Sequence, residues 1–387
     1  MPSPFAAIVL SLLAVLLAMG TSAASGAEQV SLPVPEGAYR VTLALRGAAG
    51  GSDVNVTGES RRALLQHVRV PEGEAATATF NVWRIGTGLP DGGHIRLHAE
   101  REVGTATYDD LLTLRVFGER PLLDGLTIEP AGEGVVNVFL AGDSTVTDQT
   151  GVPWSSWGAM LPGYFDETVA VANLASSGRA LRSFRAERRF GKILSLLRPG
   201  DYVFIQFGHN DQKERGEGIG PFESYTDDLI AYVEAVRAAG GRPVLVTPPV
   251  RRRFDREGQW YDTLGDYPVA VRRVAADREV PLIDLFEQSR QIVEALGEES
   301  SKNLYVHFPA GTFADQPEAW KDDTHFRTYG GDLLARAVIE EMKSAVPDLA
   351  ARLRDPSTGV DSTQPDPLSA WDWPEPGTPA SRVPEGS

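Results

Sequence analysis

Four short segments of the chain contain residue types that together can carry out acyl transfer. They are Gly142–Thr145, Asn173–Arg179, Gly208–Asp211 and Asp322–His325. The first supplies a hydroxyl nucleophile, and the last supplies a general base with a carboxylate to orient it. The middle two supply hydrogen-bond donors for a developing oxyanion. One such segment is a common turn, but four in this order, the first three each after an apolar run, predict a serine esterase.

Ser144 is the candidate nucleophile, and a helix cap is the alternative interpretation of its turn. His325 is the candidate base, because Asp322 lies three residues earlier and a single turn can set its carboxylate against the imidazole Nδ1. We expect the neighbouring Asp323 to be solvated or to cap the following helix. His209 is a rival base without a carboxylate at that spacing, and we interpret it as a structural or substrate-contacting residue.

Gly178 and Asn210 are the candidate oxyanion donors. A glycine N–H can approach an oxyanion without steric interference, and an asparagine amide adds a second donor. Their alternative interpretations are a turn glycine and an asparagine that caps a strand. We predict no metal and no cofactor: His94 and His98 are four residues apart, but the residues between them alternate as in a strand and lack the glutamate of a helical zinc motif.

The net charge of −16 argues against a nucleic-acid partner, since phosphates require a basic surface. An acidic substrate would therefore need a local basic patch. Four residues are candidates for substrate binding. They are Arg179, which begins a run of arginines at helical spacing, His209, Arg252 in a triple arginine, and the aromatic Trp260 that follows it. Guanidinium groups bind carboxylates in a bidentate manner. The alternative is that these arginines pair with acids of the protein itself.

Residues 1–27 resemble a signal peptide, because an apolar run of Ala, Ile, Val and Leu precedes small residues at a plausible cleavage site. Export and the absence of cysteine require stability without disulfides. Residues 28–130 contain short alternating runs separated by Gly and Pro, which predicts a small β-sandwich domain that resembles a carbohydrate-binding module. Residues 355–387 are rich in Pro, Ser and Asp and predict a disordered acidic tail, with docking of Trp371 and Trp373 on the catalytic domain as the alternative.

Residues 133–350 alternate short apolar runs with helical patterns, which predicts an α/β domain with a parallel sheet covered on both faces. In such sheets the ligand site lies beyond the carboxyl ends of the strands. Ser144, Gly178 and Asn210 each follow a predicted strand at that end. This placement supports their assignment to one site.

The four segments resemble the four sequence blocks of the SGNH (GDSL) hydrolase superfamily, and within it the rhamnogalacturonan acetylesterase family. The resemblance covers residues 135–346 and implies a flavodoxin-like three-layer fold, with Ser144, His325 and Asp322 as the triad and Gly178 and Asn210 as oxyanion donors. Many members have serine where this chain has Ala180, which concerns substrate detail more than catalysis.

We therefore expect a secreted or periplasmic serine esterase that removes acetyl groups from plant cell-wall polysaccharide, most closely rhamnogalacturonan pectin. The alternatives are an acetylxylan or general carbohydrate acetylesterase and, from another class, a degenerate carbohydrate-binding protein. We expect its partner to be an acetylated polysaccharide or oligosaccharide, with no nucleic acid, and no membrane after signal cleavage. We expect the protein to be a monomer.

Overall fold

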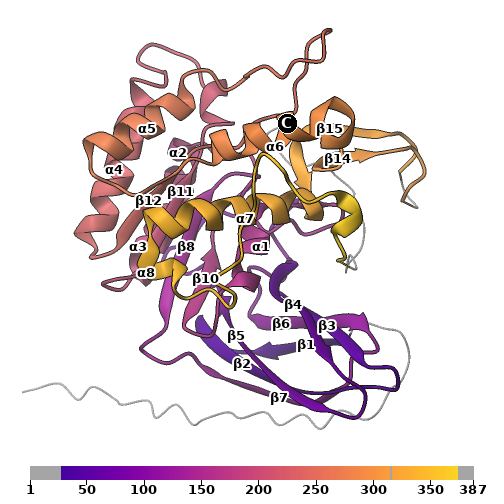
Figure 1. Ribbon diagram of the computed structural model, residues 1–387. Helices are drawn as coiled ribbons and strands as arrows, with labels where there is room; N and C mark the ends of the chain where they lie inside the picture. The colour runs from indigo at the N-terminus through magenta and orange to yellow at the C-terminus, as the bar shows by residue number, and fades with distance from the viewer. Residues whose placement is uncertain (1–27, 314–315, 374–387) are drawn as a thin grey trace, which may run out of the picture.

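Two antiparallel sheets form the N-terminal part of the computed structural model, which describes residues 28–313 and 316–373 (Figure 1). The strand order is β1-β6-β3-β4 in the first sheet and β5-β2-β7 in the second. The strands are β1 (Glu28–Pro33), β2 (Gly37–Arg46), β3 (Ser52–Gly58), β4 (Arg62–Val70), β5 (Ala75–Arg84), β6 (Leu111–Glu119) and β7 (Leu123–Pro130).

The two sheets share one hydrophobic core. Along β2, Val41, Leu43 and Leu45 are buried at every second position, as expected for a strand that turns one face to a core. They pack in one cluster with Val56 of the first sheet and Leu126 of the second. The predicted β-sandwich is therefore confirmed, and what it binds stays a prediction.

A five-stranded parallel sheet follows the sandwich along the chain, with the strand order β10-β8-β11-β12-β13. Its strands are β8 (Val136–Gly142), β10 (Val169–Asn173), β11 (Tyr202–Gln206), β12 (Arg242–Val246) and β13 (Leu282–Ile283). Numbered within this sheet, the order is 2-1-3-4-5, which is the flavodoxin-like order. The first strand, β8, therefore lies between β10 and β11, and a ligand site is expected beyond its carboxyl end.

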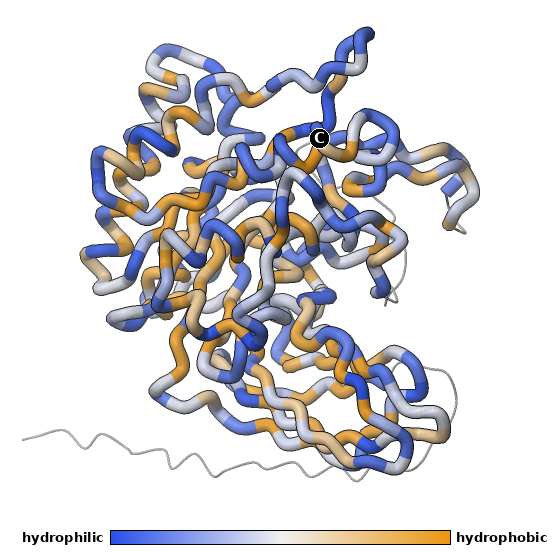
Figure 2. The backbone as a smooth tube through the Cα atoms, viewed as in Figure 1, coloured by the Kyte–Doolittle hydropathy of each residue, from blue (hydrophilic) through white to orange (hydrophobic). Residues whose placement is uncertain are grey.

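Helices cover both faces of this sheet. One face packs against α1 (Trp157–Met160), α6 (Leu285–Ser301), α7 (Thr328–Ala345) and α8 (Pro347–Ala350), and the other against α2 (Leu181–Ala186), α3 (Arg189–Leu196), α4 (Ser224–Ala238) and α5 (Tyr267–Asp277). Along β8, Val138 and Leu140 belong to the first core, while Phe139 and Ala141 belong to the second. In Figure 2, apolar residues concentrate along the inner strands and the outer loops are largely hydrophilic. The predicted three-layer fold is confirmed.

A small fourth sheet carries the last of the four segments. Its order is β14-β15-β9, formed by β9 (Trp154–Ser155), β14 (Tyr305–Phe308) and β15 (Trp320–Arg327). The chain passes directly from the end of β15 into α7. The described residues also contain three short 3₁₀ helices: η1 (Leu161–Tyr164), η2 (Asp211–Lys213) and η3 (Leu368–Ala370).

The C-terminal segment differs from the prediction of a disordered tail, because residues 355–373 pack against the rest of the protein. In Figure 1 this yellow segment crosses α7 toward β4. Trp373 is 8% exposed and meets Phe117 of β6 edge-on, with ring centroids 5.4 Å apart. Tyr329 donates a hydrogen bond to the Asp366 carbonyl. Trp371 lies beside Tyr329 of α7, as the alternative interpretation held, whereas Trp373 packs on the sandwich instead.

The remaining predictions about the two ends of the chain fall outside the described residues. These are the signal peptide at 1–27 and the rest of the acidic tail at 374–387. Within the part that the structure describes, no helix is both long and apolar enough to cross a bilayer.

We predict that Trp373→Ala lowers the free energy of unfolding by about 3 kcal/mol, because the substitution leaves a cavity beside Phe117 in a packed aromatic contact. Urea unfolding followed by far-ultraviolet circular dichroism measures the change. Trp371→Ala is the matched control, since Trp371 is only half-buried and should lose less than half as much. Equal stability of the wild type and Trp373→Ala would show that the segment does not contribute to the fold.

Candidate active site

Ser144 lies in a tight turn at the carboxyl end of β8. Asp143 forms this turn by accepting hydrogen bonds at Oδ1 from the Thr145 N–H at 3.0 Å and the Thr145 hydroxyl at 2.8 Å. A Cβ atom at Gly142 would lie 2.5 Å from Val146 Cγ2, so the turn requires glycine at its entry. Ser144 itself is 1% exposed. The turn therefore fixes the hydroxyl in a desolvated position at the sheet edge.

His325 joins Ser144 to Asp322 through both of its ring nitrogens. Its Nε2 lies 2.8 Å from Ser144 Oγ, and its Nδ1 lies 2.8 Å from Asp322 Oδ2. Ser144 follows β8, whereas Asp322 and His325 lie in β15, and Ser144 and His325 are 181 positions apart in the chain. Hydroxyl, imidazole and carboxylate are thus connected in the order that a Ser-His-Asp triad requires.

The Asp322 carboxylate is held by its own turn. Its Oδ1 accepts hydrogen bonds from the backbone N–H groups of Thr324 and His325, each at 2.9 Å. Burial alone would raise the pKa of Asp322, but the hydrogen bonds from the His325 ring and from the two backbone N–H groups outweigh it and hold the pKa below its ordinary value. Asp322 is therefore ionised and can stabilise a protonated imidazole.

The loops that carry Gly178 and Asn210 meet beside Ser144. Gly178 has a φ of +79°, a left-handed conformation that favours glycine. The Asn210 amide donates to the carbonyl of Arg179, the next residue, at 3.3 Å. Gln149 Nε2 donates to the Ser144 carbonyl at 2.8 Å and lies 3.5 Å from Ser177 Oγ, which connects this loop to the nucleophile turn. Both candidate oxyanion donors therefore lie in loops that adjoin Ser144.

His209 lies beneath this site and is 1% exposed. Its Nδ1 is 3.5 Å from Asp143 Oδ2, which is too long for a hydrogen bond of good geometry. Neither ring nitrogen has a hydrogen-bond partner among the described residues. Burial lowers the pKa of His209 against the opposing effect of Asp143, so the imidazole is neutral near pH 7. His325, rather than His209, contacts Ser144.

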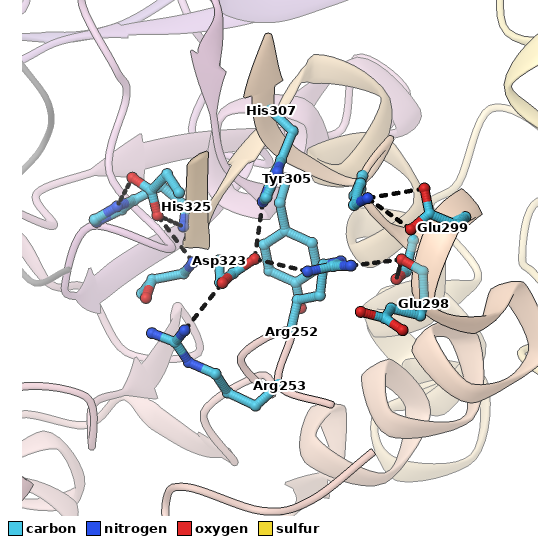
Figure 3. Close-up of polar contacts among 12 residues, drawn as sticks. Arg252, Arg253, Glu298, Glu299, Tyr305, His307, Asp323 and His325 are labelled. Carbon is cyan, nitrogen blue, oxygen red and sulfur yellow. Dashed lines mark hydrogen bonds and ion pairs between the residues drawn. The ribbon is translucent and has the colours of Figure 1, made fainter. Parts of the chain in front are cut away.

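Asp323 is neither solvated nor a helix cap, which corrects the expectation from the sequence. Figure 3 shows its carboxylate between Arg252, Arg253 and His307. Its Oδ1 lies 2.8 Å from His307 Nε2 and accepts from Arg252 Nη1 at 3.0 Å, and its Oδ2 accepts from Arg253 at 3.0 Å. The N-cap position of α7 is Arg327, four residues beyond Asp323, and no side chain caps the helix there. Asp323 instead binds β15 to β14 and to the triple arginine.

Three of the four candidate substrate-binding residues have polar partners within the protein, and the fourth, His209, is buried without a hydrogen-bond partner among the described residues. Arg179 pairs with Glu187 at 2.9 Å, and Arg252 is buried, with Asp323 and the Glu298 carbonyl as partners. Trp260 Nε1 donates to the Arg251 carbonyl at 3.0 Å. Of the neighbouring arginines, Arg182 and Arg185 pair with Asp228, and Arg188 pairs with Asp91. These contacts favour the ion-pair alternative, while a role in substrate contact stays a prediction.

The sequence reasoning missed residues that support the nucleophile turn from outside the four segments. Asp148 is buried, accepts from Asn173 Nδ2 at 2.8 Å and pairs with Arg62 of β4. Gln149 holds the Ser144 carbonyl. The one available signal was a pair of charged residues, Arg61 and Arg62, directly before the apolar residues 63–65. In the described ranges, no cluster of three or more His, Cys, Asp or Glu residues is arranged to hold a metal ion.

Comparison with known proteins agrees with this geometry. Residues 140–333 match the model of the GDSL-like Lipase/Acylhydrolase family. The chain belongs to this family. The matched span contains all four segments of the site, and the family places the chain among the carboxylic ester hydrolases.

Similar proteins include two rhamnogalacturonan acetylesterases. RhgT of Bacillus subtilis is 39% identical over 222 residues, which cover 57% of this chain and 93% of RhgT. The enzyme of Emericella nidulans is 42% identical over 224 residues, covering 52% of this chain and 83% of that enzyme. The crystal structure of YxiM from Bacillus subtilis is 25% identical with a TM-score of 0.48, covering 81% of this chain and 79% of YxiM. The predicted resemblance to the rhamnogalacturonan acetylesterases is confirmed.

Asp211, next to the candidate oxyanion donor Asn210, is a buried acid without a compensating cation. Its Oδ1 accepts from the Leu181 N–H at 2.9 Å, at the start of α2, and its Oδ2 has no hydrogen-bond partner among the described residues. Burial raises the pKa of Asp211 to about 8. The folded protein therefore keeps this carboxyl protonated at pH values where the unfolded chain has lost the proton.

We predict that Asp211→Asn stabilises the fold increasingly as pH rises. The unfolded carboxyl loses its proton near pH 4 and the folded one near pH 8, so wild-type stability falls over that window by at most about 1.4 kcal/mol per pH unit. The asparagine removes this dependence. Urea unfolding at a series of pH values measures the difference, with the exposed Asp277→Asn as control. A constant difference between wild type and Asp211→Asn would contradict the raised pKa.

Proposed function

We propose that the protein is an exported, monomeric serine esterase, secreted or periplasmic, that removes acetyl groups from plant cell-wall polysaccharide of the rhamnogalacturonan type. The observation that carries the proposal is the continuous hydrogen-bond chain from Ser144 through His325 to Asp322. The similarity to two rhamnogalacturonan acetylesterases supports the choice of acyl group and substrate class. In this proposal no metal or cofactor takes part.

The proposed reaction begins when Ser144 Oγ attacks the acetyl carbonyl and passes its proton to His325 Nε2. The carbonyl oxygen becomes an oxyanion, and the Gly178 N–H and the Asn210 amide stabilise it. His325 then donates its proton to the departing sugar oxygen as the acyl bond breaks. A water molecule, deprotonated by His325, hydrolyses the acetyl-serine and releases acetate. Asp322 keeps the ring oriented and stabilises its positive charge in both steps.

Acetylxylan is the alternative substrate on the same scaffold. The protein carries a net charge of −16, so long-range electrostatics does not attract a polyuronate such as pectin.

Contact with an acidic polymer would require an exposed arginine near the site. Among the residues of the Asp323 network, Arg253 has the most exposed side chain, with 46% accessible, while Arg252 is buried. Arg253 is therefore the better probe of contact with an acidic polymer than Arg252, whose replacement would disturb the network.

We predict that the wild type releases acetate faster from acetylated rhamnogalacturonan than from acetylated xylan, and that Ser144→Ala lowers turnover on both by about three orders of magnitude or more. Enzymatic detection of acetate, with nitrophenyl acetate as a small neutral ester, provides the measurement. A folded Ser144→Ala protein with wild-type turnover would refute the nucleophile. Faster release from xylan would replace the pectin proposal with the acetylxylan alternative, and no release from any ester would favour a carbohydrate-binding protein.

We predict that Asp322→Asn and Asp323→Asn affect turnover very differently. Asp322 contacts the His325 ring, so its replacement should lower kcat by up to about 10⁴-fold, because the asparagine favours the wrong imidazole tautomer. Asp323 contacts Arg252, Arg253 and His307 instead, so Asp323→Asn should lower stability and reduce kcat less than about tenfold. Steady-state kinetics on nitrophenyl acetate tests the pair. Equal losses of kcat in the two variants, or a larger loss in Asp323→Asn, would show that Asp322 is not the triad carboxylate.

A further inference from the structure

The turn between β3 and β4 of the β-sandwich places Arg62 inside the catalytic part of the protein. Arg62 is completely buried, and its Nε and Nη2 donate to Asp148 Oδ2 at 3.0 and 2.8 Å. Its Nη1 donates to the carbonyls of Trp83 in β5 and Val171 in β10, each at 3.3 Å. One guanidinium therefore binds the sandwich, the parallel sheet and the loop after Ser144 at the same time.

Asn173 connects Asp148 to two loops, the one that contains Ser144 and the one that leads to Gly178. The Asn173 amide nitrogen donates to Asp148 Oδ1 at 2.8 Å and to the Val146 carbonyl, two residues after Ser144, at 2.7 Å. Its amide oxygen accepts from the Ala175 N–H at 3.1 Å, in the loop that leads to Gly178. The nucleophile turn and the Gly178 loop are thus held by one side chain that Arg62 and Asp148 fix in place.

Two further residues of the N-terminal part reach the same loops. Arg61 donates to the Trp154 carbonyl at 2.8 Å and to the Gln149 carbonyl at 3.4 Å, and Gln149 in turn holds the Ser144 carbonyl. Glu102, in the segment between β5 and β6, accepts from the Ser176 hydroxyl at 2.8 Å. Arg61 and Glu102 contact neighbours of Ser144 and Gly178 in the chain or in space, not these two residues themselves. Neither side chain therefore touches the reacting atoms.

We propose that the β-sandwich is a positioning module of the catalytic centre, and that Arg62 is its principal positioning residue. Arg62 acts through Asp148 and Asn173 to fix the distance between the serine hydroxyl and the donors of the Gly178 loop. A fully buried guanidinium is stable only with its carboxylate and carbonyl partners in place, so the two parts of the chain hold a single mutual arrangement. The inference rests on the proposed roles of Ser144 and Gly178.

The test compares Arg62→Met, Arg62→Lys and the double variant Arg62→Met/Asp148→Asn in the full chain. The readouts are kcat and KM for nitrophenyl acetate, the rate at which a fluorophosphonate labels Ser144, and the melting temperature. We expect Arg62→Met to lower kcat and the labelling rate by about ten- to a hundredfold, since small displacements of catalytic groups cost that much, with KM changed less than about twofold. The matched control, Arg46→Met, removes an exposed pair with Asp124 and should match the wild type.

The double variant separates positioning from folding. It removes both buried charges, so its melting temperature should recover relative to Arg62→Met, whereas kcat and labelling should stay low. Arg62→Lys keeps a charge but lacks the fork that reaches Asp148 and two carbonyls, so it should fold with intermediate kcat, and it provides the comparison if Arg62→Met does not fold. Recovery of kcat together with stability in the double variant would overturn the proposal. If the wild type is not labelled at Ser144, the proposed nucleophile fails and the role of Arg62 fails with it. Labelling of the wild type at Ser144 together with unchanged kcat in Arg62→Met would overturn the role of Arg62 alone.

Discussion

The position of β8 between β10 and β11 is the constraint on which the site depends. Because all strands of this sheet are parallel, the loops after β8, β10 and β11 leave the same edge and must lie side by side. Register pairs Gly142 with Gln206 and Leu140 with Asn173, so the ends of these strands coincide. The serine turn, the Gly178 loop and the Asn210 loop are neighbours for this reason alone, before any side-chain contact forms.

The base does not come from the parallel sheet, because His325 lies in β15 of the small fourth sheet. β15 carries His325 to Ser144 and is fixed on one side by β14 and on the other by β9, which follows the nucleophile loop. The Asp323 network adds an electrostatic connection from β15 to the loop after β12. The two adjacent aspartates thus have separate tasks, since Asp322 orients the imidazole while Asp323 holds the strand that presents it.

Sequence reasoning predicted the contacts that depend on local turns and strand ends. The spacing of Asp322 and His325 predicts their contact, because one turn joins them, and the apolar runs before Ser144, Gly178 and Asn210 predict a shared sheet edge. The contact of Arg62 with Asp148 joins residues 86 positions apart in two different folding units, and no spacing rule relates them. The predictions of a solvated or capping Asp323 and of a disordered tail failed for the same reason. Arg252, Arg253 and Phe117, which contact them, lie far away in the chain, and local sequence does not reveal such partners.

The docked C-terminal segment affects the order in which parts of the fold are completed during synthesis. The sandwich strands emerge first, yet Phe117 of β6 receives its aromatic partner Trp373 only after the whole α/β part has been synthesised. Arg62 likewise emerges before Asp148 and Val171, so its charge stays solvated until translation has passed both of them. The earliest part of the fold is therefore completed last, and a chain that stops before Trp373 leaves Phe117 without this cover.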